Sequence, residues 1–290
     1  MNYVLIFNGL GNQMSQYAFY LAKRRVDKQC RLLVIDNPNS HNGYELERVF
    51  GIMNNETRFD SLVKWVYTRF YHRWIFKYLV RILGVNEIRE PLNYNYTPSF
   101  LSQKNMLINI YIGGWHSEKY FKTMTNEVKS IFSFKEINDE IYLELLGRIK
   151  LDKNSVSLHV RRGDYLNIKS TDYWQLGGVA TDEYYQKAID YISVNVETPH
   201  FYIFSNDMEW CKQNIRMDNV TYVIINQGLN SWRDMHCMSM CRHHIMANST
   251  FSWWGAWLSP YENGITLHPR WFIRDIETPD FYPERWKCIE

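Results

Sequence analysis

The chain has 290 residues, and its 33 Lys and Arg nearly balance its 31 Asp and Glu, so the formal net charge is only +2. This length suits one large domain or two medium ones. A charge this balanced gives no general reason to expect nucleic acid as a partner. Hydrophobic residues at 46% and charged residues at 22% are typical of a globular protein. Five scattered cysteines, an odd number, suit reduced thiols and predict a cytoplasmic location.

The first 36 residues are predicted to form a βαβ unit. A strand is expected over Tyr3–Phe7, a loop over Asn8–Gln13, a helix over Ser15–Val26 and a second strand over Arg31–Asp36. The N-terminus has neither a basic region nor a cleavage site, so it is interpreted as the first strand and not as a signal peptide. No stretch approaches the roughly 18 uninterrupted apolar residues of a membrane span.

The middle of the chain is less regular. Segment 37–60 is polar and expected to be rich in loops, whereas segment 61–90 has a helical pattern with many aromatic and basic residues. A strand is expected over Met106–Ile112, followed by helices over Glu118–Phe132 and Asn138–Lys150.

A second α/β unit is predicted to begin near Asn154, because apolar strand-like runs and helical segments alternate from there to the end. Two such units predict two facing Rossmann-like domains with a cleft between them, over residues 1–153 and 154–290. The expected strands are Val156–Val160, His200–Ser205, Thr221–Ile225, Ile245–Asn248 and Ile265–His268, and the expected helices are Thr181–Val196, Met208–Ile215, Ser231–Cys241 and Ser252–Leu258.

Two adjacent arginines follow the first strand of this second unit, in the string His159-Val-Arg-Arg-Gly-Asp164. The carboxyl end of a parallel strand is where α/β folds bind anionic ligands, and a guanidinium offers a planar, permanently charged fork to a phosphate. Asp164 could orient one arginine or act on the substrate. The alternative is a surface turn with an Arg–Asp ion pair.

Two further segments are candidate anion sites. The Gly9-Leu-Gly-Asn-Gln13 loop precedes a predicted helix, whose free N–H groups favour an anion, although the glycines taken alone favour a simple tight turn. It matches neither a dinucleotide fingerprint nor a Walker motif. The second segment is Asn248-Ser-Thr-Phe-Ser252, where Ser249, Thr250 or Ser252 is expected to cap the following helix while the hydroxyl and N–H groups bind a diphosphate.

Two carboxylates complete the candidate set. Asp207 ends the string Phe204-Ser-Asn-Asp207 at a strand end, and Asp234 stands in the first turn of a predicted helix. A carboxylate at Asp234 could accept two hydrogen bonds from guanine, or it could simply stabilise the helix dipole. The nearby His236, Cys237, Cys241, His243 and His244 fit no familiar zinc spacing and are interpreted as packing residues.

The segment Lys64–Arg81 is both basic and aromatic. It suits a helix lying on an anionic membrane surface, a wall that binds an acceptor, or a helix that covers the core with its bases outward. Neutralising Lys64, Arg69, Arg73 and Arg81 separates the first interpretation from the others.

Three strings together resemble the bacterial α-1,2-fucosyltransferases of glycosyltransferase family 11. They are Gly9–Gln13, His159–Asp164 and Asn248-Ser-Thr-Phe-Ser-Trp-Trp-Gly-Ala-Trp257, and they occur in family order. Phe204–Asp207 and Trp115-His-Ser-Glu-Lys-Tyr-Phe121 are also similar to that family.

The resemblance implies a GT-B-type α/β fold, in which residues 1–153, with their aromatic and basic helical insertion, form the acceptor-side domain and residues 154–290 bind the GDP-fucose donor. It also implies transfer of L-fucose, with inversion, from GDP-β-L-fucose to the 2-hydroxyl of a terminal galactoside. No metal or other cofactor is implied, which agrees with the absence of an Asp-x-Asp motif at a strand end. The acceptor is expected to be a glycan or a lipid-linked glycan such as an O-antigen unit, met at the inner face of the membrane.

By the same resemblance Arg161 and Asp164 are the catalytic candidates. The expected donor-binding residues are Gly9, Gly11, Asn12, His159, Arg161, Arg162, Asp207, Asp234, Asn248, Ser249, Thr250 and Phe251. Arg161 is expected to hold the β-phosphate while Arg162 orders the loop or shares the charge. The general base is not singled out; besides Asp164, weaker alternatives are His41, Glu45 and Glu118.

Two other functions remain open. One is a fucosyltransferase of the same fold with a different acceptor, and the other is a nucleotide-sugar binding module without turnover.

Overall fold

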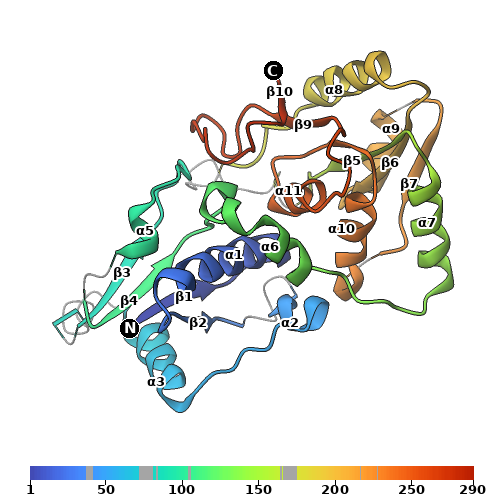
Figure 1. The fold of residues 1–290 in the computed structure, drawn as a ribbon. Coiled ribbons are helices and arrows are strands. Elements are labelled where there is room, and N and C mark those ends of the chain that lie inside the picture. The colour runs from blue at the N-terminus through green and yellow to red at the C-terminus, as the bar shows by residue number, and fades with distance from the viewer. Residues whose placement is uncertain are drawn as a thin grey trace. The chain divides into compact units, whose positions relative to one another are not determined.

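The computed structural model forms two compact units, Met1–Lys135 and Glu136–Glu290 (Figure 1). The residues it describes are 1–36, 42–71, 81–82, 84–103, 106–163, 165, 175–215, 217–226 and 228–290. Each unit is an α/β layer structure around a parallel sheet, so the predicted α/β class is confirmed. The boundary lies earlier than the expected 153, because helix α7 (Glu140–Leu151) packs on α10 (Trp232–Ser239) of the second unit.

The first unit has a four-stranded sheet in the order β2-β1-β4-β3, and all its pairs are parallel. Side chains of successive residues leave opposite faces of a strand. Tyr3 and Leu5 of β1 therefore share one buried cluster with Val63 and Tyr67. The strands are β1 Asn2–Ile6, β2 Arg31–Val34, β3 Val85–Arg89 and β4 Ile108–Ile112.

The helices of the first unit differ in part from those expected. Helix α1 begins at Leu10 and not at Ser15, so most of the predicted Gly9–Gln13 loop is its first turn. The helical pattern expected over 61–90 is wrong at its C-terminal end, because Val85–Arg89 forms strand β3 and pairs with β4. The described helices are α1 Leu10–Val26, α2 Glu45–Phe50, α3 Arg58–Val66, π-helical η1 Tyr67–Tyr71, α5 Ser99–Ser102, 3₁₀ turns η2 Glu118–Tyr120 and η3 Lys122–Met124, and α6 Thr125–Ile131.

The second unit has a six-stranded sheet in the order β10-β9-β8-β5-β6-β7, again entirely parallel. Strand β5 lies between β6 and β8, and all six of its residues are buried. The C-terminal β10 was not predicted. The strands are β5 Ser155–Val160, β6 His200–Ser205, β7 Val220–Val223, β8 His243–Ile245, β9 Thr266–Pro269 and β10 Lys287–Ile289.

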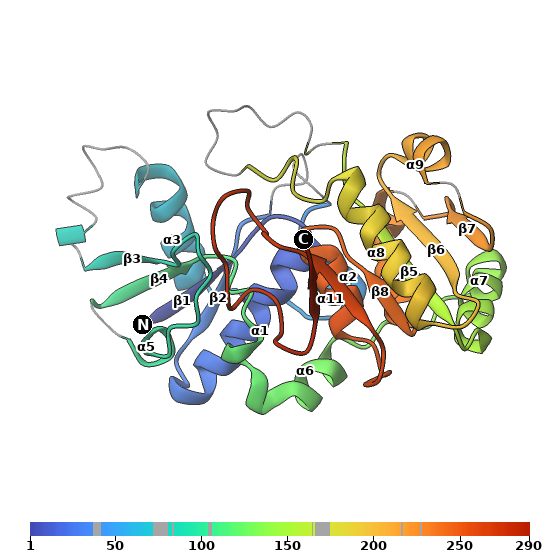
Figure 2. The same ribbon diagram turned by 90° about the horizontal axis from the view of Figure 1, so that it is seen from above.

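Helices cover both faces of this sheet. On one face, Tyr184 and Ala188 of α8 share a buried cluster with Val156 and Leu158 of β5 (Figure 2). On the other face, α10 and α11 pack on each other, and the His159 ring lies 5.8 Å from the ring of Phe251. The remaining helical bounds are α8 Asp182–Asn195, α9 Met208–Asn214, η5 Gly228–Asn230 and α11 Thr250–Trp257.

None of the helices in the described ranges combines the length and the apolar character that crossing a bilayer requires.

A buried carboxylate joins helix α3 to the first sheet. Asp60 is 1% exposed; it accepts hydrogen bonds from the Tyr3 hydroxyl at 2.8 Å and the Thr57 N–H at 2.8 Å, and it pairs with Arg31 at 2.7 Å. Burial opposes the charged form, but these hydrogen bonds hold the pKa of Asp60 below its usual value. The carboxylate therefore stabilises the fold above the unfolded pKa, and this contribution is lost as the pH falls through the folded value.

We expect Asp60→Ala to lower the free energy of unfolding by roughly 3 kcal/mol at neutral pH, because it removes the carboxylate that accepts from the buried Tyr3 hydroxyl and pairs with Arg31. Denaturant unfolding measures this loss. Glu47→Ala, at an exposed position of α2, is the control and should change stability by less than about 0.5 kcal/mol. Equal effects of the two substitutions would contradict the structural role of Asp60.

Candidate functional site

The two arginines follow β5 directly, and the neighbouring strand ends bring other candidate residues beside them. Because β8, β5 and β6 are adjacent and parallel, their carboxyl ends lie at one edge of the sheet. This edge, which we call the β5 edge, carries from these three strands His159, Arg161, Arg162, Asn206, Asp207, Asn248, Ser249, Thr250 and Phe251. It is also the edge at which open α/β sheets bind their ligands.

Arg162 is held firmly by its own unit. Its N–H donates to the Asn206 side-chain oxygen at 3.0 Å, and its guanidinium carbon lies 4.0 Å from the centre of the Trp210 ring. The guanidinium also lies 3.5 Å from an oxygen of Asp182 and 3.7 Å from one of Asp207. These contacts fix the turn that carries both arginines, and the role of Arg162 towards a donor stays a prediction.

Gly163 shows why this turn needs a small residue. A Cβ placed there would lie 2.9 Å from the side-chain nitrogen of Asn206, the residue that holds Arg162. Asn206 and Trp210 were not among the predicted site residues, although Asn206 belongs to the string Phe204–Asp207 that drew attention to this strand end.

Arg161 points to a different set of neighbours. Its guanidinium carbon lies 5.7 Å from the centre of the Tyr165 ring, and the Tyr165 hydroxyl donates to the Asn248 carbonyl at 3.3 Å. Arg161 is therefore linked to the loop that precedes α11. The second catalytic candidate, Asp164, lies outside the described residues, as does the alternative base His41.

The loop before α11 confirms the predicted cap. Ser249 is the N-cap of α11, and its hydroxyl accepts the Phe251 N–H at 3.3 Å. The amide nitrogen of Asn248 donates to the carbonyls of Leu176 and Phe272, both at 2.9 Å. Because the NH₂ group of the buried Asn248 side chain is engaged by these two carbonyls, it holds the loop in place.

Asp207 and Asp234 also have local partners. Asp207 caps α9 by accepting the Trp210 N–H at 3.3 Å. Asp234 lies in the first turn of α10, as predicted, and accepts a hydrogen bond from the Asn226 amide at 2.7 Å. Burial raises the pKa of Asp234 to about 7, against the lowering effect of that hydrogen bond. Among the described residues, the buried side-chain oxygen of Asn226 has no partner.

The N-terminus of α1 does not match the expected open anion site. Glu45 is 3% exposed, and its carboxylate accepts the Leu10 N–H at 3.0 Å. The Glu45 N–H in turn donates to the Gln13 side-chain oxygen at 2.9 Å. An internal carboxylate therefore occupies this helix end, where Gly9 is the N-cap and Gly11 and Asn12 lie in the first turn. These contacts also argue against Glu45 as the general base.

A second buried carboxyl group, Glu90, follows β3 at the carboxyl edge of the first sheet, and sequence reasoning missed it. Its oxygen accepts the Trp115 N–H at 2.6 Å, in the loop that follows β4. A Cβ on Gly113 would lie 2.5 Å from the Glu90 Cβ, so the loop can come this close to Glu90 only with glycine at that position. Burial raises the pKa of Glu90 to about 8, although hydrogen bonds from Trp115 and Gly114 lower it.

His116 in the same loop is also uncharged. Its Nδ1 lies 3.0 Å from the Ser15 hydroxyl of α1, and burial lowers its pKa to about 3. At neutral pH this edge of the first sheet therefore carries a protonated carboxyl group and a neutral imidazole.

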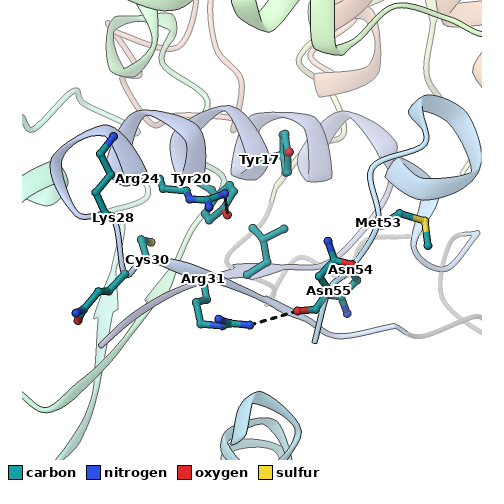
Figure 3. Close-up of a pocket in the computed structure, with 11 residues that line it drawn as sticks. Tyr17, Tyr20, Arg24, Lys28, Cys30, Arg31, Met53, Asn54 and Asn55 are labelled. Carbon is teal, nitrogen blue, oxygen red and sulfur yellow. Dashed lines mark hydrogen bonds between the residues drawn. The ribbon is translucent and has the colours of Figure 1, made fainter. Parts of the chain in front are cut away.

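A cavity of about 310 Å³ in the first unit lies elsewhere (Figure 3). It is beside Cys30 and Arg31 at the amino end of β2, the opposite end from the α1 N-terminus. Arg31 is engaged by Asp60 and by the Asn55 carbonyl, and Arg24 donates to the Tyr20 hydroxyl at 2.9 Å. This cavity is therefore separate from the predicted donor residues.

Histidines and cysteines near α10 pack in the interior of the second unit. Cys237 and Cys241 are fully buried, and the His244 imidazole contacts the Ser157 hydroxyl at 2.8 Å. Across the described ranges, no three His, Cys, Asp or Glu side chains gather closely enough to hold a metal ion.

Comparison with known protein families gives one match that covers most of the chain. Residues 94–289 match the family described as Glycosyl transferase family 11. This range includes the whole β5 edge and the Trp115–Phe121 string.

Two of the curated proteins that are similar in sequence illustrate the match. An Escherichia coli α-1,2-colitosyltransferase is 32% identical over 292 residues, which span 97% of this chain and 96% of that protein. The human galactoside α-(1,2)-fucosyltransferase 1 is 32% identical over 182 residues, which span 59% of this chain and 49% of that protein.

Among solved structures, the fucosyltransferase NodZ from Bradyrhizobium is similar with a TM-score of 0.50. The sequence identity is 12%, and the likeness covers 89% of this chain and 92% of that one. At this identity the likeness concerns the fold alone.

The Glu90 carboxyl group should make stability depend on pH. Its folded pKa of about 8 lies above the value of roughly 4.3 for an unfolded chain. The linked stability is therefore complete at low pH and is lost as the pH rises through about 8. We expect Glu90→Gln to unfold like the wild type at acidic pH and to be the more stable protein at alkaline pH, in denaturant titrations across this range. Parallel pH profiles would contradict the assignment.

Proposed function

The chain belongs to glycosyltransferase family 11, and from that premise we propose that it transfers L-fucose from GDP-β-L-fucose to the 2-hydroxyl of a terminal galactoside. The support for the linkage and the acceptor comes from relatives whose names describe α-1,2 transfer and galactosides. The O-antigen context is supported by a further relative, the E. coli O-antigen biosynthesis glycosyltransferase WbnK, 31% identical over 93% of this chain.

The observation that carries the proposal is the pair of arginines at the β5 edge. Arg162 is already held by Asn206, Asp182 and Trp210. We assign the phosphate contact to Arg161, which stands at the end of a fully buried strand. Ser249, Thr250 and Phe251, at the N-terminus of α11, complete the diphosphate site in this proposal. The N–H groups of Ser249 and Phe251, which donate to the Ala247 carbonyl and to the Ser249 hydroxyl, would exchange these partners for phosphate oxygens.

The nucleoside is assigned to the same unit. His159 and Asp234 face the guanine in this proposal. Asp234, which is hydrogen-bonded to the Asn226 amide, supplies the carboxylate that accepts hydrogen bonds from the base. Because the pKa of Asp234 is raised to about 7, a guanine that donates two hydrogen bonds would favour its charged form and lower that pKa. The contribution of Gly9, Gly11 and Asn12 to donor binding stays a prediction.

In the proposed reaction, the bond between fucose and the β-phosphate breaks as the acceptor 2-hydroxyl attacks from the opposite face of the sugar. Positive charge develops on the ring, and negative charge develops on GDP. Arg161 and the N-terminus of α11 stabilise the growing charge on GDP, which is the part that a metal ion plays in other transferases. We keep Asp164 as the candidate that receives the hydroxyl proton or orients the arginines.

A second donor merits equal testing because one relative is an α-1,2-colitosyltransferase. Colitose is fucose without its 3-hydroxyl, so the two donors share the same nucleotide and anomeric chemistry. A site that hydrogen-bonds the 3-hydroxyl would reject colitose strongly, whereas an apolar site would discriminate only weakly.

We expect Arg161→Ala to lower kcat/KM for GDP-fucose by about 10²- to 10³-fold, the range for losing one group that stabilises charge in the transition state. The mutant should unfold at the wild-type denaturant concentration. Arg270→Ala is the matched control, since Arg270 is a half-exposed arginine of the same unit that pairs with Glu277. A well-folded Arg161→Ala protein with near-normal rates would refute the phosphate assignment.

Release of GDP from GDP-fucose and from GDP-colitose, with EDTA present and with or without lactose, tests the reaction itself. Lactose-dependent release and a fucosylated product are expected, with no loss of rate in EDTA. Loss of activity on chelation would contradict the metal-free mechanism. Donor binding without release on any acceptor would favour the binding module, and release only with other acceptors would change the acceptor class.

A further inference from the structure

Helix α3 exposes a row of large apolar side chains. Its core face carries Val63, and the Tyr67 side chain of the following turn continues that face into the buried cluster of the first unit. On the outside, Phe59, Leu62 and Trp65 are 49%, 53% and 56% exposed. We call these three residues the α3 stripe. Neighbouring exposed apolar side chains of this size are a feature that interaction surfaces share.

The direction of this stripe is fixed by the fold. Thr57 and Asp60 form a capping box that starts the helix, and Asp60 is anchored to Tyr3 and Arg31 beneath it. Because the opposite face is buried against the sheet, the helix cannot rotate to hide the stripe in its own unit.

The surroundings of the stripe are positively charged. Three acidic side chains of this part of the described chain have basic partners: Glu56 pairs with Lys64 at 2.6 Å, Asp60 with Arg31 at 2.7 Å and Glu87 with Arg89 at 2.7 Å.

Two exposed arginines remain beyond these pairs. None of the ion pairs among the described residues includes Arg58 or Arg69. With α-helical spacing, Arg58, Leu62 and Trp65 follow at i, i+4 and i+7 on one side of α3. Arg69 lies in the π-helical turn η1 that continues the helix, so an arginine precedes and another follows the apolar residues along the chain.

We propose that the α3 stripe, with Arg58 and Arg69, is a docking surface for an anionic lipid bilayer. Leu62 and Trp65 enter the boundary between headgroups and acyl chains, and the two arginines remain at the level of the lipid phosphates. A second copy of this chain fits less well as the partner. It would place its own Arg58 and Arg69 near those of the first copy, and the like charges would repel each other.

This surface differs from the segment Lys64–Arg81 that the sequence suggested. Lys64 is neutralised by Glu56, and the membrane contact begins earlier, at Arg58. The inference is independent of the proposed transfer reaction, since it uses no residue of the β5 edge. It would bring the protein to the surface where lipid-linked glycans are found.

Vesicle flotation tests the proposal. The full-length protein should float with vesicles of phosphatidylcholine and phosphatidylglycerol, should bind pure phosphatidylcholine much more weakly, and should be released by high salt. Leu62→Ser with Trp65→Ser should reduce the bound fraction by about tenfold or more, and so should Arg58→Gln with Arg69→Gln.

The control is Ile141→Ser with Val194→Ser, which removes two exposed apolar residues of the second unit and should float like the wild type. All variants should keep the wild-type unfolding midpoint and the wild-type rate on a soluble acceptor. The proposal is overturned if the wild type stays with the soluble fraction, if it binds neutral vesicles equally well, or if both stripe variants float unchanged. Failure of transfer activity, by contrast, would leave the flotation result intact.

Discussion

The parallel direction of every strand is the constraint on which the rest of the structure depends. In a parallel sheet all carboxyl ends lie at one edge, so residues far apart in the chain meet there. His159 is the last residue but one of β5, Asn206 follows β6 and Ser249 lies in the loop after β8, and the adjacency of these strands brings the three together. Crossover helices then bury both faces of the sheet, which leaves this edge as the place where polar groups can remain accessible.

The two arginines of the β5 edge have different neighbours in the fold. Arg162 is fixed by Asn206 through its backbone and by Trp210 and Asp182 through its side chain, so the turn that carries both arginines is set before any ligand binds. Preorganised charge is more effective than charge that must first be ordered. The α1 N-terminus of the first unit shows the contrast, because Glu45 already satisfies it.

The sequence allowed β5, β6 and the cap of α11 to be predicted, because apolar runs and a serine before a helix are local signals. The start of α1 was misplaced since Gly9 and Gly11 suggest a loop, while the group that stabilises the helix, Glu45, comes from a distant segment. Strand β3 was missed because its sequence Val-Asn-Glu-Ile-Arg is polar at an edge of the sheet. Glu90 could not be recognised, because its burial depends on the Gly113–Trp115 loop.

The charges at the carboxyl edges of the two sheets fit different ligands. In the second unit the edge carries Arg161 and Arg162, which suits a diphosphate. In the first unit, burial raises the pKa of Glu90 to about 8 and lowers that of His116 to about 3, so both side chains are uncharged at neutral pH. Neither side chain therefore adds a charge to this edge, in contrast to the two arginines of the β5 edge. The division of charge within the chain therefore follows the proposed division between donor and acceptor.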